Sequence, residues 1–398
     1  MSSWFLLIFA LIGAMLVANA TWPTRGTKSM LPSWIGVFLT VDLAFHHIAL
    51  HVIVVAICYW LGAFDAWPAR VGLAILVIID LQLVRLWLPN LEAAGVAEKT
   101  ATDMQLDAVD PVPPSLMFSP FARSRDGVEV VKNVEFRRVA GRSLSLDVYR
   151  PEANSDNRPA LVYVHGGGWL FGDKREQGLP LCLHMATLGW VCFNVNYRLS
   201  PGATWPDHLV DVKAAIAWIR EHAGEYGVDP SFIAVAGGSA GGHIAAMAGL
   251  TPGREDLQPG FEDADTGVQA VVPGYAVLDL TNRLGAHHPE FLTKIVGPLV
   301  LKAFPDTEPG KFSAASPREF CEEATQPWLL LHGDADTLTP VAEARDFYEQ
   351  LDAGSGRLTG YAEFPGAAHA FDIYYSPRAN AAVNLTARFL ATVHSQAS

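Results

Sequence analysis

A short glycine-rich segment, Gly237-Gly238-Ser239-Ala240-Gly241, has the residue types of an activated serine nucleophile. It follows an apolar run at 232–236 that is typical of a buried strand, and it precedes a helix-compatible run. A serine in a sharp strand-to-helix turn exposes its hydroxyl above the sheet, and small residues must stand two positions before and after it. Gly237 and Gly241 meet that requirement. The alternative is a phosphate-binding turn, but neither a Lys-Ser/Thr pair nor Gly-x-Gly-x-x-Gly spacing accompanies the segment.

A second glycine run, His165-Gly166-Gly167-Gly168-Trp169, lies about seventy residues before the serine and directly after the apolar run 161–164. Acyl transfer requires N–H donors directed at the point where the carbonyl oxygen becomes negative. Glycine is suited to that position because it lets the backbone approach closely. The alternative is a simple turn between a strand and a helix. Together, the two glycine motifs favour acyl transfer.

The serine also needs a general base and a group that orients the base. The run 328–331 is followed by Asp334 and Asp336, and the run ending at 364 is followed by His369. The order Ser239, Asp336, His369 is one of the chain orders known for Ser-His-Asp triads. In this interpretation His369 takes the serine proton and Asp336 holds the other imidazole nitrogen. Asp334 is the alternative acid, and His165 is interpreted as a structural group.

Alternating strand and helix patterns must position these residues. Between 128 and 398 the sequence predicts a helix at 207–222 and an α/β architecture with a mostly parallel sheet buried on both faces. The segment 279–325 lacks strand signals, so we expect a helical insertion there. The predicted strands are 161–164, 191–195, 232–236, 268–272, 328–331 and 358–364.

The first ninety residues differ from the rest, with 60 hydrophobic residues and a net charge of +1. The remainder carries a net charge of −14, which disfavours nucleic-acid binding. Six tryptophans stand at the ends of three apolar runs, as expected for a membrane-interface belt. The sequence therefore predicts transmembrane helices at about 4–22, 34–60 and 67–87. The alternative for the first run is a cleaved signal peptide, because Ala18-Asn19-Ala20 has the spacing of a cleavage site.

Ionisable groups inside these runs are candidates for function. Asp42, His46, His47 and His51 spread over about half of a helix circumference, which favours interhelical or interfacial contacts over a metal or proton path. The short-loop basic residues are Arg25, Lys28 and Lys99 on one side against Arg70 on the other. This count predicts a cytoplasmic catalytic domain.

Residues 91–127 are interpreted as a proline-rich linker that is able to act as a cap. Within it, Met117, Phe118 and Phe121 are candidates to cover the pocket, together with the insertion. Such a cover would suit lipid-like esters. The four cysteines, Cys58, Cys182, Cys192 and Cys321, have no spacing typical of a disulfide framework or a zinc site.

The stretch from about 128 to 395 resembles the α/β-hydrolase superfamily, in its hormone-sensitive-lipase-like and bacterial carboxylesterase branches. The resemblance implies that Gly167, Gly168 and Ala240 supply oxyanion N–H groups and that Arg198 pairs with Asp207 or Asp211 as scaffold. Membrane-anchored esterases of actinobacterial type have a similar layout, which implies a multi-pass protein of a bacterial cell membrane. The matching residues are 165–169, 196–201, Asp229-Pro230, 237–242, Asp336 and His369.

Two positions depart from the hormone-sensitive-lipase pattern. Gly238 stands where many relatives carry an acid or threonine, and Leu199-Ser200-Pro201-Gly202 lacks the usual acidic residue. The first departure is nearer to feruloyl-esterase-like and formamidase-like relatives. The hypothesis is a serine carboxylesterase for small or lipid-like esters, with no metal or organic cofactor. The alternatives are an amidase, formamidase or peptidase with the same triad, and a non-catalytic membrane-tethered binding protein.

Overall fold

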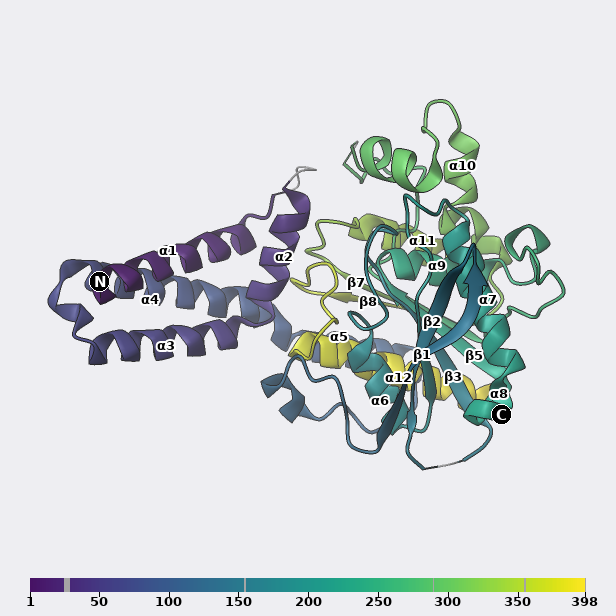
Figure 1. Ribbon diagram of the computed structural model, residues 1–398, viewed down its shortest axis with the longest axis horizontal. Helices are drawn as coiled ribbons and strands as arrows, with labels where there is room; N and C mark the ends of the chain where they lie inside the picture. The colour runs from purple at the N-terminus through teal and green to yellow at the C-terminus, as the bar shows by residue number, and fades with distance from the viewer. Residues whose placement is uncertain (25–28, 154, 289, 354–355, 398) are drawn as a thin grey trace.

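The computed structural model describes residues 1–24, 29–153, 155–288, 290–353 and 356–397, and an eight-stranded sheet forms its centre (Figure 1). The strand order is β1-β2-β4-β3-β5-β6-β7-β8. β2 pairs antiparallel with both β1 and β4, and the remaining pairs are parallel. The strands are β1 (Val128–Val139), β2 (Arg142–Pro151), β3 (Arg158–Val164), β4 (Val191–Val195), β5 (Val228–Gly238), β6 (Ala270–Gly274), β7 (Trp328–Gly333) and β8 (Thr359–Phe364).

Helices cover both faces of this sheet because its central strands are apolar on both sides. In β3, Val162 and Val164 belong to the core cluster that includes residues of α7, α9 and α11, whereas Leu161 and Tyr163 belong to the cluster that includes residues of α5, α6 and α12. The mostly parallel α/β sheet expected from the sequence is confirmed. The helices are α5 (Ala93–Asp103), α6 (Leu179–Thr187), α7 (Asp207–Glu221), α8 (Ala223–Tyr226), α9 (Ala240–Leu250), α11 (Val341–Asp352) and α12 (Pro377–Ala397), with the short η4 (Glu255–Leu257).

Between β6 and β7 the chain contains no further strand among its described residues. It forms a π-helical segment η5 (Phe291–Leu301), α10 (Pro309–Ala314) and η6 (Pro317–Glu323). These elements make up most of the segment 279–325. Figure 1 shows α10 at the top of the domain in this view.

The N-terminal helices form an arm that projects from the domain (Figure 1). α1 (Ser2–Thr21) and the run from α4 (Trp67–Trp87) through η2 (Leu88–Leu91) to α5 are each long and apolar enough to cross a membrane. The second predicted span is wrong as a single helix. It consists of α2 (Met30–Val41) and α3 (Ala44–Trp60), bent by 79°. A short η1 (Ala63–Asp65) then leads to α4.

The bend follows from a contact with the domain. Asp42, directly after α2, pairs with Arg378 of α12 at 2.7 Å, and both side chains are shielded from solvent. Tyr374 also donates its hydroxyl to the carbonyl oxygen of Phe38. These contacts hold α2 across the domain, so it cannot continue in line with α3.

Polar groups in the arm make contacts between helices and with the domain. His51 of α3 lies 2.6 Å from Asp80 of α4, and His47 lies 3.2 Å from the carbonyl oxygen of Leu39. Among the described residues no group of three metal-ligating side chains comes together. Arg25 and Lys28, which entered the topology prediction, lie outside the described residues.

The interpretation of residues 91–127 as an irregular linker is wrong in its first part. α5 continues from α4 and packs Ala93, Ala97 and Ala101 against α12 and β8. The reason is that the prolines cluster at 111–120, and the alanine-rich stretch before them is free to form a helix. After α5 the chain is irregular apart from η3 (Pro114–Phe118).

Candidate active site

Ser239 lies between the end of β5 and the start of α9, at the carboxyl ends of the parallel strands. Its backbone has φ 57° and ψ −124°, a strained conformation for a residue with a side chain. The turn is held because Ser239 N–H donates to the Gly274 carbonyl at 2.9 Å, and His243 N–H donates to the Ser239 carbonyl at 2.9 Å. The strain is therefore built into the junction of strand and helix.

The neighbouring glycines are required by close backbone approach. A Cβ on Gly237 would lie 2.5 Å from the carbonyl oxygen of Gly241, which is the collision across the turn expected from the sequence. A Cβ on Gly238 would overlap the phenol ring of Tyr275. This second overlap accounts for the glycine at position 238.

His369 lies between Ser239 and Asp336. Its Nε2 is 2.8 Å from Ser239 Oγ, and its Nδ1 is 2.7 Å from Asp336 Oδ2. These two contacts leave Nδ1 as the donor to the carboxylate and Nε2 as the acceptor of the serine proton. The structure thus brings the three sequence-predicted residues into hydrogen-bonding contact.

The Asp336 carboxylate is shielded from solvent and receives several donors. Its Oδ1 accepts the N–H groups of Leu338 at 2.8 Å and Thr339 at 2.9 Å, and Oδ2 accepts the Thr339 hydroxyl at 2.8 Å. Burial alone would raise the pKa of Asp336, but the adjacent His369 and these donors hold it below its usual value. Asp334, the alternative acid, is exposed and accepts the Gly366 N–H at 2.6 Å instead.

A cavity of about 250 Å³ opens beside Ser239 and His369. Gly167, Gly168 and Ala240, the predicted oxyanion donors, line it. Ala240 is the first residue of α9, so its N–H has no partner within the helix. The other lining residues are mostly apolar: Trp34, Trp169, Leu170, Phe171, Val277, Phe291, Ile295, Leu338 and Ala370, with Gln177 and Thr339.

The insertion 279–325 and the proline-rich segment, both predicted to cover the pocket, differ in position. Phe291 and Ile295 of the insertion line the cavity. Phe118 and Phe121 of the proline-rich segment are exposed and are absent from the lining. Their place is taken by Trp34 of α2, whose indole N–H donates to the His369 carbonyl at 2.7 Å. The sequence carries no signal for this contact, because 335 residues separate the partners.

The remaining motif residues support the glycine loop. His165 is buried, stacks on Tyr197 with ring centroids 4.5 Å apart, and bonds the Gly166 carbonyl at 2.8 Å. Burial lowers the pKa of His165 to about 4, so the ring is neutral near pH 7. Trp169 donates its indole N–H to His243 at 3.3 Å. These residues have a structural position and make no contact with the Ser239 hydroxyl.

Arg198 pairs with both acids considered for it. Its Nε lies 2.7 Å from Asp211 and its Nη2 lies 3.2 Å from Asp207. The pairs tie the start of α7 to the loop after β4, outside the cavity. They are therefore part of the scaffold.

Sequence reasoning missed a hydrogen-bonded pair next to His369, formed by the buried Tyr275 and the half-buried Asp372. The Tyr275 hydroxyl donates to Asp372 at 2.5 Å, and its ring lies edge-on to His369 with centroids 4.9 Å apart. Tyr275 N–H also donates to the Leu331 carbonyl at 2.6 Å. A single sequence offers little signal for Tyr275, since it lies just past a strand with no motif around it.

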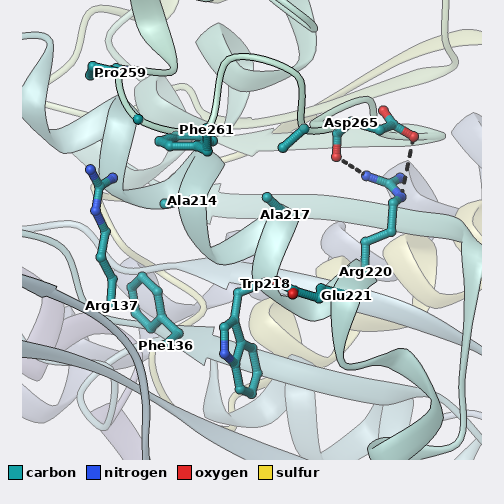
Figure 2. Close-up of a pocket in the computed structure, with 12 residues that line it drawn as sticks. Phe136, Arg137, Ala214, Ala217, Trp218, Arg220, Glu221, Pro259, Phe261 and Asp265 are labelled. Carbon is teal, nitrogen blue, oxygen red and sulfur yellow. Dashed lines mark hydrogen bonds and ion pairs between the residues drawn. The ribbon is translucent and has the colours of Figure 1, made fainter.

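A second hollow, of about 570 Å³, is lined by residues of α7, β1 and the segment 259–265, and Ser239 and His369 are not among them. Figure 2 shows these lining residues. The hollow's described lining residues include no serine, cysteine or histidine. Arg220 in its wall already bonds the carbonyl oxygen of Asp265 at 2.5 Å. Of these two hollows, the smaller one combines a nucleophile, a base and backbone donors.

Comparisons with known proteins fit this geometry. The sequence profile of the BD-FAE family matches residues 146–351. The protein named Probable carboxylic ester hydrolase LipM, from Mycobacterium tuberculosis, is 44% identical over 256 residues, which are 64% of this chain and 59% of LipM. Esterase LipQ from the same organism is 43% identical over 257 residues, 64% of this chain and 60% of LipQ. The chain thus spans about three fifths of the length of these relatives.

Among solved structures, Thermogutta terrifontis esterase 2 phosphonylated by sarin is similar, with a TM-score of 0.55 and 29% identity. The similarity covers 66% of this chain and 92% of that one.

Proposed function

The chain belongs to the BD-FAE family, within the carboxylesterase branch of the α/β-hydrolases, and we propose from this membership and from its site that it is a membrane-anchored serine carboxylesterase. The observation that carries the proposal is the contact of His369 Nε2 with Ser239 Oγ at 2.8 Å, with Asp336 at the opposite nitrogen. This is the arrangement that allows an imidazole to remove a serine proton.

In the proposed reaction, Ser239 Oγ attacks the ester carbonyl carbon while His369 Nε2 takes its proton. The negative charge that forms on the carbonyl oxygen is stabilised by N–H groups of the lining residues Gly167, Gly168 and Ala240. The charge on the imidazole is balanced by Asp336. The intermediate then collapses, His369 returns the proton to the leaving alcohol, and an acyl-enzyme remains on Ser239.

The second half uses the same groups with water in place of the alcohol. His369 removes a proton from water, the hydroxide attacks the acyl carbon, and the carboxylic acid leaves as Ser239 recovers its proton. The mostly apolar walls of the cavity favour an apolar ester. Two similar proteins, the probable carboxylic ester hydrolase LipM and an esterase that has been phosphonylated by sarin, support this chemistry.

The test is Ser239→Ala in the full-length protein. We expect hydrolysis of p-nitrophenyl butyrate to fall about 10⁵–10⁶-fold, as in other triads. A fluorophosphonate probe should label the wild type at Ser239 and leave the variant unlabelled. Near wild-type hydrolysis by folded Ser239→Ala would refute the mechanism, and a matched amide substrate cleaved faster than the ester would indicate an amidase.

The anchoring part of the proposal rests on the arm. α1 is 20 residues long and exposes large apolar side chains such as Phe5, Ile8 and Met15 to its surroundings. Lipid would cover such a surface, whereas water would not favour it. We expect the protein to stay with membranes after carbonate washing and to be released by detergent. Recovery in the carbonate supernatant would contradict the anchor.

A further inference from the structure

Helix α2 belongs by sequence to the apolar N-terminal segment, yet it forms part of the cavity beside Ser239. Trp34, on its first turns, lines the cavity, and its ring lies edge-on to the His369 ring with centroids 5.9 Å apart. Its indole N–H donates to the His369 carbonyl at 2.7 Å. Trp34 therefore contacts both the space that holds substrate and the residue that moves the proton.

The chemistry indicates which part of an ester lies against Trp34. His369 must return its proton to the oxygen of the departing alcohol, so that oxygen has to lie beside Nε2. The carbonyl oxygen is directed elsewhere, toward the glycine donors. A group packed against the His369 ring and facing the cavity therefore adjoins the alcohol side of the bound ester.

An aromatic strip continues from Trp34 along the junction of arm and domain. Phe38 stacks on Trp34 with ring centroids 5.3 Å apart, and Tyr374 packs on Phe38 at 5.3 Å. Phe121 packs on Tyr374 at 5.4 Å and is exposed. These ring contacts join the cavity wall to the exposed Phe121 through Tyr374, which is itself buried. The accessible apolar surface beside the cavity is therefore that of the half-buried Trp34 and Phe38.

The position of α2 is fixed by buried polar contacts. The Asp42–Arg378 pair lies at its C-terminal end, and the Tyr374 hydroxyl donates to the Phe38 carbonyl in its middle. With the Trp34 bond near its start, α2 is attached to the domain at three points. It is thereby a fixed wall of the cavity.

We infer that Trp34 is a specificity-determining residue for the alcohol part of the substrate, and that the enzyme takes esters whose alcohol carries an apolar chain lying along α2. This inference rests on the proposed esterase function and extends it. The cavity of about 250 Å³ lies below the usual range for ligand pockets, so a short acyl group fits within it while a longer alcohol extends past Trp34 along α2.

The experiment varies the two halves of the ester separately, with full-length protein in detergent. One series is ethyl and hexyl acetate, and the other is ethyl acetate and ethyl hexanoate, with acid release measured by pH-stat titration. The variants are Trp34→Ala and Trp34→Phe. Trp60→Ala is the matched control, because Trp60 ends α3 in the same segment and is 84% exposed.

We expect Trp34→Ala to lower the kcat/KM ratio of hexyl to ethyl acetate about tenfold, and to leave the ratio of ethyl hexanoate to ethyl acetate within about threefold. Trp34→Phe should retain most of the alcohol preference but lower kcat for all esters about threefold to tenfold, since it keeps the ring and loses the bond to His369. Trp60→Ala should match the wild type. Each ratio is independent of the folded fraction, so partial unfolding of a variant does not affect the result.

An unchanged alcohol ratio, a rise in that ratio, or an equal change in both series for Trp34→Ala would overturn the inference while leaving an active esterase. A wild type that hydrolyses neither series and is not labelled by a fluorophosphonate would overturn the proposed function and this inference with it. The two failures are therefore distinguishable.

Discussion

Replacing Asp336 by asparagine exchanges one carboxylate oxygen for an NH₂ group. The donors around the side chain determine which oxygen is replaced, and so how His369 is oriented toward Ser239. The Leu338 and Thr339 N–H groups both point at Oδ1. An asparagine must therefore place its oxygen there, because the reversed amide would leave two buried donors without acceptors at a cost of about 2–6 kcal/mol. Its NH₂ group then occupies the Oδ2 position, 2.7 Å from His369 Nδ1.

An NH₂ group at that position forces Nδ1 to accept, and the imidazole proton moves to Nε2. Nε2 then donates to Ser239 and cannot take its proton. We expect Asp336→Asn to lower kcat about 10⁴-fold, equivalent to about 5 kcal/mol in the barrier. The fold should persist, since the Thr339 hydroxyl is able to accept from the new amide.

The assay is the steady-state hydrolysis of p-nitrophenyl butyrate, together with the rate of fluorophosphonate labelling and a thermal melt. The matched control is Asp334→Asn, which changes an exposed carboxylate of the same loop and should cost less than about threefold, as expected away from the reacting groups. A folded Asp336→Asn with activity within tenfold of the wild type would refute the reasoning. A large loss in Asp334→Asn alone would assign the orienting role to that residue.

Three further outcomes are expected. Gly238→Ala should destabilise the fold by about 1–3 kcal/mol and reduce activity, because its methyl group would overlap Tyr275; an unchanged melting temperature would contradict this. Asp42→Ala should destabilise the fold by about 3–5 kcal/mol, because it leaves Arg378 buried without its partner. The double variant Asp42→Leu with Arg378→Met should recover most of the lost stability, as measured by thermal melts. Burial lowers the pKa of folded His243 to about 4, below the unfolded value of 6.5, so this residue makes the folded state less stable as pH falls from 6.5 to 4. His243→Gln should therefore reduce the slope of melting temperature against pH in that range, and a slope equal to that of the wild type would contradict this.

The positions around Ser239 were predictable because local sequence determines them. Glycines at 237 and 241 indicate a collision that occurs within five residues of chain. The runs before Ser239 and Asp336 are apolar enough to mark inner parallel strands, and the run before His369 forms β8 at the edge of the sheet. Each of the three residues therefore follows a strand of the same sheet, and the carboxyl ends of its parallel strands lie on one side of the domain.

The missed elements depend on distant contacts or on mixed patterns. Charged residues interrupt both β1 and β2, so the apolar run that marks a central strand is absent. The break in the second apolar run depends on Arg378, more than 300 residues away. Trp34 was interpreted as a membrane-belt residue for the same reason, since its partner His369 is equally remote.

In the proposed membrane-anchored esterase, the continuous run from α4 into α5 would determine how the domain sits at a bilayer. It extends over 37 residues, about 55 Å of helix, and its last part is packed into the hydrolase domain. A stiff connection of this kind allows little swivelling, unlike a flexible tether that lets a domain sample many heights. The mouth of the cavity would therefore stand at one depth relative to the lipid headgroups, and the thickness of the host membrane would help decide which esters it meets.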